Sequence, residues 1–482
     1  MAQPEQSRLL RLADELLIQI AQHIDSSQDL CSLAVTCSRL QGFAEPVLYS
    51  SILIRNGSKA LKLFNAILRR SGRALFVRKL HIRYRSDGEA GIEILNLALL
   101  HLLKLKELLI EAPCCNDTPS QRADFQSQGK IDYATYFEFA SSMTLGPQPQ
   151  VQIPLETLVL HSHNVRGPDR RAFDMGKNAV IFLHPTLRNL TISCFDIGEN
   201  IKSYLSASKN STVLRSLIFD ECNITTDGLA AILSVPKALE SLTIGERIHH
   251  RSNHEPLGRH PAKFLKALAL QERSLTYVKH IGGRTDLPHK STQLSLATFS
   301  NIKNMKLDAD SILTRILKET APPWAPTIPP NLKLCLLLPC DELYLDDEDD
   351  VWYSPVMSMV EWLGRVSNLD IVVDFDGRNN MDRVIQSLWK GRLGPRLLKQ
   401  ILRLVGPGRE HGRLDKRSLR ISVVRWTGFI PPYMYGEELP QEELIFDSDD
   451  YISGVDESLE GCEGSDAPEG EDDLVDLVEF LS

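Results

Sequence analysis

The sequence has no apolar run long enough to cross a lipid bilayer. The longest candidate, residues 94–103, has about half of the roughly 20 residues that a transmembrane helix needs, and it contains His101. Charged residues such as Arg8, Arg11 and Asp14 interrupt the first apolar residues, which is not typical of a secretory signal peptide. We therefore expect a chain that does not interact with membranes.

Cysteine is scarce and shows no paired pattern. Nine cysteines are present, and none forms a CxxC pair, although Cys114 and Cys115 are adjacent. The disulfide framework of a secreted protein usually needs an even number of cysteines. This use of cysteine favours reduced thiols and hence a cytoplasmic or nuclear location, or both.

Basic residues are missing from the end of the chain. From Glu437 to Ser482 the sequence has 18 acidic residues and no Lys or Arg, which leaves 45 acids against 54 bases elsewhere. Such a mild excess of bases does not indicate nucleic-acid binding, which requires a clustered basic footprint. Like charges repel one another, so we expect residues 431–482 to form a disordered acidic tail. Its last ten residues alternate acidic and apolar side chains and could instead dock on a partner or on the basic body.

No familiar catalytic motif is present. The patterns GxxxxGK[ST], GxSxG and HExxH do not occur. Histidines at positions 249, 250, 254 and 260 match no established zinc spacing, so we interpret them as part of a solvated basic loop. Asp374 and Asp376 precede a glycine, which fits a strand that enters a turn better than a metal site. We expect no enzyme, no metal and no cofactor.

The first fifty residues predict a compact unit of three short helices. Residues 14–24 place their apolar side chains on one helical face. Ser26 and Asp29 have capping-box spacing at the start of a second helix, and Pro46 should end or kink a third. Three short helices bury little surface alone, so this unit should need a partner or a neighbouring domain.

A repeated pattern of the form L-x-x-L-x-I/L follows. The central positions of its strong copies are 80, 108, 158, 190, 217 and 242. Weaker copies start at Leu275, Ile302, Leu332, Leu369 and Leu419. Leucine-rich repeats have periods of roughly 20–29 residues. Spacings of 28, 27 and 25 fit this period, whereas spacings of 50 and 32 contain insertions.

Each repeat of this kind is a strand followed by a helix, and stacking the repeats creates one core and a parallel sheet on the concave side. The clearest unit predicts a strand at 214–219 and a helix near 227–233. We therefore expect an α/β solenoid, a horseshoe, over residues 53–430 with insertions at 113–154 and 245–261. Aromatic residues in the first insertion indicate a helix around 133–140, which either covers a substrate or packs on the solenoid.

The N-terminal unit, residues 8–52, resembles an F-box. The three matching segments are Leu12-Ala-Asp-Glu-Leu-Leu-Ile-Gln-Ile-Ala-Gln-His-Ile24, Asp29-Leu-Cys-Ser-Leu-Ala-Val-Thr-Cys-Ser-Arg-Leu40 and Ala44-Glu-Pro-Val-Leu-Tyr49. They follow the family's form LPxELLxxI…dLxxLxxtCrrl…pxLy, except that Ala13 stands where the family usually has proline. An F-box followed by degenerate leucine-rich repeats is similar to the F-box proteins of filamentous fungi.

The resemblance implies a non-catalytic substrate receptor of an SCF-type ubiquitin ligase. The F-box would bind the adaptor Skp1, which links it to a cullin and a RING protein, and the repeats would capture a protein for degradation. By position, the residues that the resemblance assigns to the Skp1 contact are Leu12, Ala13, Leu16, Leu17, Ile20, Leu30, Leu33, Leu40 and Leu48. The alternative is a protein-interaction scaffold without ubiquitin chemistry, in which the helices cap the solenoid.

Overall fold

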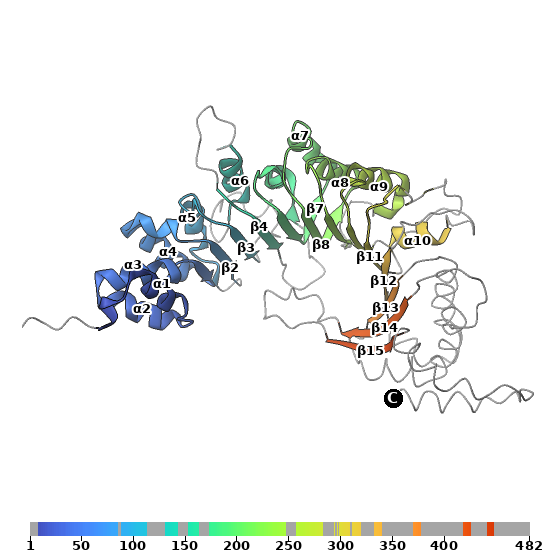
Figure 1. Cartoon of the computed structure of the whole chain (residues 1–482). Coiled ribbons are helices and arrows are strands. Elements are labelled where there is room, and N and C mark those ends of the chain that lie inside the picture. Colours follow the sequence, from blue (N-terminus) through green and yellow to red (C-terminus); the bar gives the residue numbers. More distant parts are fainter. Residues whose placement is uncertain are drawn as a thin grey trace, which may run out of the picture. The chain divides into compact units, whose positions relative to one another are not determined.

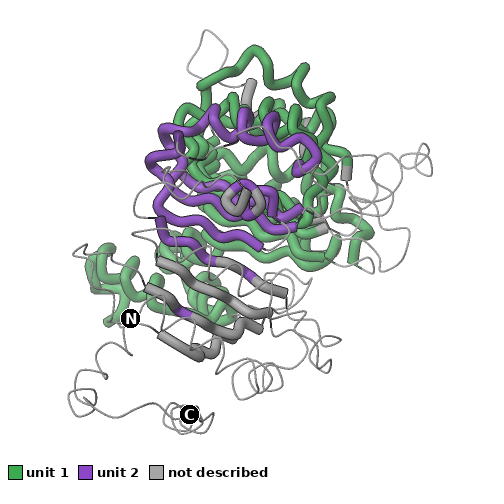
Figure 2. The backbone as a smooth tube through the Cα atoms, turned by 90° about the vertical axis from the view of Figure 1, so that its right-hand side faces the viewer, with its two compact units in different colours: residues 1–239, 247–255 green, residues 240–246, 256–482 purple. Residues whose placement is uncertain are grey.

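The structure is a computed structural model, and it describes residues 8–84, 88–112, 131–142, 153–162, 173–246, 257–282, 294, 296, 298–308, 311–319, 332–339, 370–376, 418–425 and 441–447. The chain divides into two compact units, unit 1 with residues 1–239 and 247–255, and unit 2 with 240–246 and 256–482 (Figure 2). Each unit combines helices with parallel strands, which confirms the α/β class. No helix in these stretches combines the length and the hydrophobicity of a membrane span.

Unit 1 begins with a three-helix unit, residues 8–48. The 3-10 turn η1 (Arg8–Arg11) precedes α1 (Asp14–Gln22), α2 (Ser27–Thr36) and α3 (Ser38–Leu48). As predicted, Ser26 caps α2, because its hydroxyl oxygen accepts a hydrogen bond from the Asp29 N–H at 3.2 Å. Pro46 does not end the third helix, which continues to Leu48. The N–H of Tyr49 still reaches the Glu45 carbonyl at 2.9 Å.

Parallel strands form the main sheet of unit 1 (Figure 1). In spatial order they are β1 (Ser51–Ile54), β2 (Lys79–Arg83), β3 (Glu107–Ala112), β4 (Thr157–Ser162), β6 (Asn189–Ser193) and β8 (Ser216–Ile224). The central leucines of the predicted repeats lie side by side on neighbouring strands, namely Leu80, Leu108, Leu158, Leu190 and Leu217. All of them are at most 1 % exposed, so they anchor the core. The repeat pattern therefore predicted the positions of these strands correctly.

Helices and turns connect these strands and lie along one side of the sheet (Figure 1). They are α4 (Gly57–Arg69), η2 (Ser71–Leu75), η4 (Ile92–Ile94), α5 (Leu95–Leu99), α6 (Tyr133–Ser142), η7 (Gly176–Leu183), η8 (Glu199–Ile201), α7 (Lys202–Leu205) and α8 (Thr226–Leu233). The helices predicted near 133–140 and 227–233 are confirmed by α6 and α8. Two short strands, β5 (Phe173–Asp174) and β7 (Phe195–Ile197), form a second ladder that ends on β8.

Unit 2 repeats the same strand-and-helix plan. Its strands are, in spatial order, β9 (Ser241–Glu246), β10 (Tyr277–Ile281), β11 (Asn304–Asp308), β12 (Lys333–Pro339), β13 (Asp370–Asp376), β14 (Ser418–Arg425) and β15 (Gln441–Asp447). Its helices and turns are η9 (Leu257–Arg259), α9 (Pro261–Leu268), η10 (Ala269–Gln271) and α10 (Ile312–Glu319). The weaker repeat copies coincide with strands β10 to β14, so these copies are confirmed as strand positions. In particular, Val278 pairs with both Leu242 and Met305.

One boundary drawn from the sequence is wrong. Residues 441–447 fall within the predicted disordered tail, yet they form β15, which pairs antiparallel with β14. An acidic strand can join a sheet edge because its backbone, not its side chains, makes the ladder. The rest of the predicted tail, most of the insertion at 113–154 and residues 247–256 of the second insertion lie outside the described residues.

Candidate protein-interaction surfaces

The three-helix unit buries part of the predicted Skp1-facing set. Leu17, Leu30 and Leu40 are 2 %, 5 % and 6 % exposed, so they support the fold rather than a surface. Leu30 belongs to a core cluster with Ala21 and Ala44. Two further members of the predicted set, Leu33 and Leu48, are half-buried and pack against that cluster. The remaining members of the set, with Ala13, Leu16 and Ile20 exposed, are the ones most accessible to another protein.

The exposed members of the set lie on α1 and at its start. Leu16 is 47 % exposed and Ile20 is 39 % exposed, and their spacing places them on one face of the helix. Ala13 is exposed and Leu12 is half-buried. Val35 on α2 is 85 % exposed and was missed by the sequence analysis. Val35 lies on a different face of α2 from the buried Leu30. An apolar residue on the polar face of a helix is the sequence feature that could have identified it.

Ala13, the departure from the F-box pattern, is the N-cap residue of α1. Its backbone has φ −62° and ψ 152°, and its carbonyl oxygen accepts hydrogen bonds from Leu16 N–H at 3.1 Å and Leu17 N–H at 3.2 Å. Proline fixes φ near −65°. The backbone at Ala13 therefore already has the conformation that a proline would impose.

Arg39 holds the segment before α1 against α3. Its guanidinium donates hydrogen bonds to the carbonyl of Leu10, to the carbonyl of Leu12 at 2.9 Å and to the carboxylate of Asp14 at 2.6 Å. The side chains of Arg39 and Asp14 are 41 % and 61 % exposed, so the ion pair contributes little to stability. It nevertheless fixes the position of the residues that lead into Ala13.

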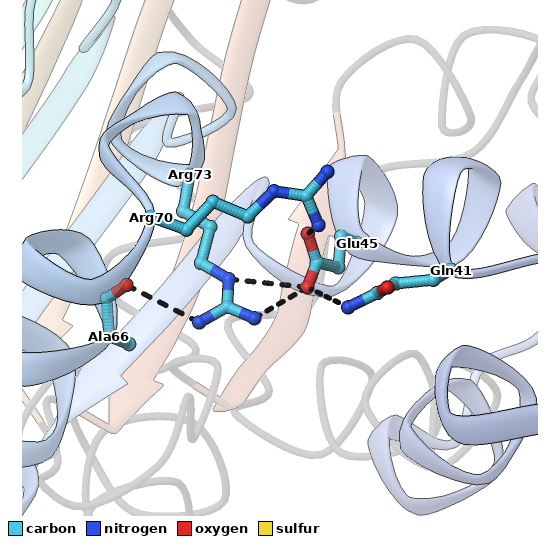
Figure 3. Close-up of polar contacts among 5 residues, drawn as sticks. All are labelled: Gln41, Glu45, Ala66, Arg70 and Arg73. Carbon is cyan, nitrogen blue, oxygen red and sulfur yellow. Dashed lines mark hydrogen bonds and ion pairs between the residues drawn. The ribbon is translucent and has the colours of Figure 1, made fainter. Parts of the chain in front are cut away.

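A buried carboxylate joins the three-helix unit to the first repeat (Figure 3). Glu45 on α3 receives hydrogen bonds from Arg70 at 2.8 Å, from Arg73 at 2.6 and 3.2 Å, and from Gln41 at 2.9 Å. Arg73 also donates to the carbonyl of Ala66 at 3.3 Å. These contacts, which we call the Glu45 junction, connect α3 with α4 and with the turn η2.

The electrostatics of the Glu45 junction favour the charged form of the acid. Burial alone would raise the pKa of Glu45, but hydrogen bonds from Arg73 and Gln41 outweigh it and hold the pKa below its ordinary value. Arg73 lies over the ring of Tyr49, with 5.3 Å between the guanidinium carbon and the ring centroid. The sequence gives no local signal for this junction, because Arg70 and Arg73 follow Glu45 by 25 and 28 residues.

The face of the unit 1 sheet that turns away from the core leucines carries three rows of side chains in register. We call it the open face. The row nearest the amino ends is polar, and there Glu107 pairs with Lys79 at 2.9 Å. Glu107 also pairs with His81 of the middle row at 2.7 Å. The middle row includes the apolar residues Leu109 and Val159, which are direct neighbours on β3 and β4.

The third row lies at the carboxyl ends of the strands. This carboxyl-end row consists of Arg83, Glu111, His161, Ser193 and Asp220, each beside the next on a neighbouring strand. Exposure falls toward it: the Glu107 side chain is 29 % exposed, whereas Glu111 and Ser193 are fully buried. Burial raises the pKa of Glu111 to about 7, although the charge of Arg83 opposes the shift. His161 is the second-last residue of β4.

Unit 2 contains a buried polar network around His280. One ring nitrogen of His280 lies 2.8 Å from Oε1 of Glu246, and the other lies 2.7 Å from Oγ of Ser311. The hydroxyl of Ser311 also accepts from Leu313 N–H, and the second oxygen of Glu246 accepts from Leu257 N–H. Serine, histidine and carboxylate occur in this order in some hydrolases, but Ser311 is fully buried and no substrate can reach it. The network instead ties β9 and β10 to the start of α10.

The described residues contain no group of three or more His, Cys, Asp or Glu side chains that could hold a metal ion. His260 is exposed, and the other histidines of the predicted basic loop lie outside the described residues. Cys194 and Cys222 are buried and form no disulfide bond, and burial raises the pKa of the Cys222 thiol. Asp374 and Asp376 lie at the end of β13, which confirms the predicted strand end.

Comparison of the chain with protein-family models finds no matching family, and comparison with curated proteins finds no similar sequence. The features that bear on function are therefore the surfaces described above and the residue pattern of the N-terminal unit.

Proposed function

We propose that this chain is the substrate-recognition subunit of an SCF-type ubiquitin ligase, with an F-box at residues 8–52 and a leucine-rich-repeat solenoid after it. The observation that carries the proposal is the exposed apolar pair Leu16 and Ile20 on a three-helix unit whose sequence follows the F-box pattern. A small helical unit that leaves large apolar side chains in solvent is suited to a protein partner. Skp1 is that partner in this proposal, and it brings the cullin and the RING protein that perform the chemistry.

The Glu45 junction supports a receptor role for the whole chain. A substrate receptor must hold its substrate at a defined position relative to the adaptor, and a flexible joint would lose that geometry. Four hydrogen bonds to one buried carboxylate, from Arg70, Arg73 and Gln41, make a rigid joint between the three-helix unit and the first repeat. The open face of the unit 1 sheet is the proposed substrate surface, in the cytoplasm or the nucleus.

Co-expression of the full chain with Skp1, followed by size-exclusion chromatography, tests the proposal. We expect the wild-type chain to co-elute with Skp1 and the double variant Leu16→Asp, Ile20→Asp to elute alone, because a charge buried in an apolar contact is costly. Leu61 and Leu68 on α4 are 50 % and 60 % exposed, so Leu61→Asp, Leu68→Asp is the matched control and should retain Skp1.

Two outcomes would count against the proposal. If the wild-type chain fails to bind Skp1, the repeats serve a scaffold without ubiquitin chemistry. Ala13→Pro is then the first variant to test, because the F-box pattern usually has proline there. If the Leu16 and Ile20 double variant still co-elutes, the adaptor contact lies elsewhere. Leu17 is not used in this test because it is 2 % exposed, and its substitution would disturb folding instead of the surface.

A further inference from the structure

The helix α4, which follows the three-helix unit, exposes large apolar side chains to solvent (Figure 1). Its inner side chains Ala60, Leu63 and Ile67 are buried in the core. On its outer side, Leu61 and Leu68 are 50 % and 60 % exposed. These two leucines are two helical turns apart, so they lie on one side of the helix.

A helix of this solenoid does not need leucines on its outer side. The helix α8 follows β8 as α4 follows β1, and its large apolar residues are all buried, namely Leu229, Ile232 and Leu233. Its outer side carries only Asp227 and the small residues Ala230 and Ala231. The two exposed leucines of α4 are therefore not explained by the packing of the repeats.

Positive side chains accompany the two leucines. Lys62 and Arg69 each follow one of them along the helix, and both are exposed. The sequence of α4 contains no acidic residue that could neutralise these charges. We call Leu61, Lys62, Leu68 and Arg69 the α4 stripe. Because the potentials of two binding surfaces are complementary, a partner of the α4 stripe combines apolar side chains with negative charge.

The end of the chain has this combination. Residues 437–482 contain 18 acidic residues and no Lys or Arg. Among them, apolar residues occur at the spacing i, i+3, i+4 and i+7 that marks one face of a helix, namely Leu474, Leu477, Val478 and Leu481. The other side of such a helix carries acids, namely Asp472, Asp476 and Glu479. This pattern is a property of the sequence, since residues 472–481 lie outside the described residues.

We propose that the α4 stripe binds the acidic, apolar segment of residues 472–481. The apolar face of the segment covers Leu61 and Leu68, as in other cases where an amphipathic helix is recognised by its apolar anchors. The carboxylates of the segment pair with Lys62 and Arg69 at the edge of the contact. A helix this short is marginal in water, so the segment completes its helix on binding. The proposal does not depend on Skp1 or on what the repeats bind.

A fluorescent peptide of residues 465–482 tests the proposal by fluorescence anisotropy. The protein is the chain ended after residue 464, which keeps every described helix and strand and lacks the segment. We expect saturable binding that weakens when the salt concentration rises from about 50 mM to about 500 mM, because charges at the exposed edge of a contact are screened. The assay reports on the segment whichever copy of the chain supplies it.

Substitutions on both sides of the contact make the test specific. Leu61→Ser with Leu68→Ser should weaken peptide binding about tenfold or more, because two apolar contacts are lost. Both side chains are exposed, so the unfolding temperature should hardly change. Leu270→Ser is the matched control, because Leu270 on η10 of unit 2 is also 50 % exposed and should not affect binding. If the double variant does not fold, a peptide with Leu477→Ser and Leu481→Ser should show the same loss on the unsubstituted protein.

Four results would overturn the inference. Absence of saturable binding would mean that the segment does not occupy the α4 stripe. Equal binding by the Leu61 and Leu68 double variant would place the contact elsewhere. Equal binding of a scrambled peptide would reduce the contact to general charge attraction. A dimer of the shortened chain that the double variant makes monomeric would show that a second copy covers the stripe. None of these readouts involves Skp1, so this inference and the adaptor proposal fail or survive separately.

Discussion

Arg73 donates two hydrogen bonds to the same oxygen of Glu45, at 2.6 Å and 3.2 Å, although 28 residues separate them in the sequence. The two residues belong to different parts of unit 1. Glu45 lies on the last helix of the three-helix unit, and Arg73 lies on a turn of the first repeat. Because Glu45 is buried, it cannot exchange these donors for water. The pair therefore couples the stability of the three-helix unit to that of the repeats.

This coupling predicts unequal effects for the two arginines of the junction. Arg73→Met should lower the free energy of unfolding by about 2 kcal/mol, because it leaves a buried carboxylate short of two charged donors. Arg70→Met should cost less than about 1 kcal/mol, because the Arg70 side chain is 52 % exposed and makes one of the hydrogen bonds. Urea denaturation of both variants, followed by circular dichroism, provides the measurement. Equal losses would contradict the assigned roles.

The pKa of Glu111 predicts how stability depends on pH. Its folded pKa of about 7 is above the unfolded value of 4.5, so the folded state holds the proton more tightly. The stabilisation from this proton is complete below 4.5 and is lost as the pH rises through about 7. Glu111→Gln should remove this dependence and stabilise the protein relative to wild type above neutral pH. Thermal unfolding of both proteins between about pH 5 and pH 8 measures it.

Glu45 gives the opposite sign and serves as the control. Its folded pKa is lowered, so its contribution is present above 4.5 and disappears as the pH falls through the folded value. Glu45→Gln should therefore change stability at neutral pH but leave the dependence between about pH 5 and pH 8 intact. If both glutamine variants showed the same profile, the contrast between the two buried acids would be wrong.

Replacement of Ala13 by proline should leave the fold unchanged. The backbone φ of −62° already suits proline, so Ala13→Pro should raise the free energy of unfolding by up to about 1 kcal/mol by restricting the unfolded chain. Ala21→Pro, inside α1, should instead cost about 3 kcal/mol or more. Differential scanning calorimetry compares the two variants. Under the proposed function Ala13→Pro should also bind Skp1 more tightly, and a loss of stability would show that the N-cap geometry is different.

Loss of the buried His280 network should lower the free energy of unfolding without altering an exposed surface. His280→Leu removes the partner of Glu246 Oε1 and one of the two hydrogen bonds of the Ser311 hydroxyl in a buried site, so we expect a loss of about 3 kcal/mol. His260 is exposed, and His260→Leu should change stability by less than about 0.5 kcal/mol. Hydrogen exchange of the β10 amides should accelerate in the first variant alone. Unchanged exchange would show that the network does not hold unit 2 together.

Sequence patterns predicted the strands that carry the L-x-x-L-x-I/L pattern well because the signal is local. A leucine at the centre of each copy faces the core from a short strand, and stacking requires the same position in every copy, so Leu80, Leu108 and Leu158 had to align. The same reasoning located weak copies such as the one at Met305. The same reasoning did not predict β15. This edge strand forms because its backbone pairs with that of β14, and backbone pairing leaves no pattern of side chains in the sequence.

By itself, the sequence determined the α/β class, the positions of the strands that carry the repeat pattern and the three short helices at the start, since apolar periodicity and caps such as Ser26 act within a few residues. Tertiary structure alone decided which of the predicted surface leucines are buried, how Glu45 meets Arg73, and that no donor in the described part of the chain reaches Glu111. These three properties depend on groups that are distant along the chain. Burial and the pKa shifts that follow from it are set by everything packed around a side chain, and that environment exists only after folding.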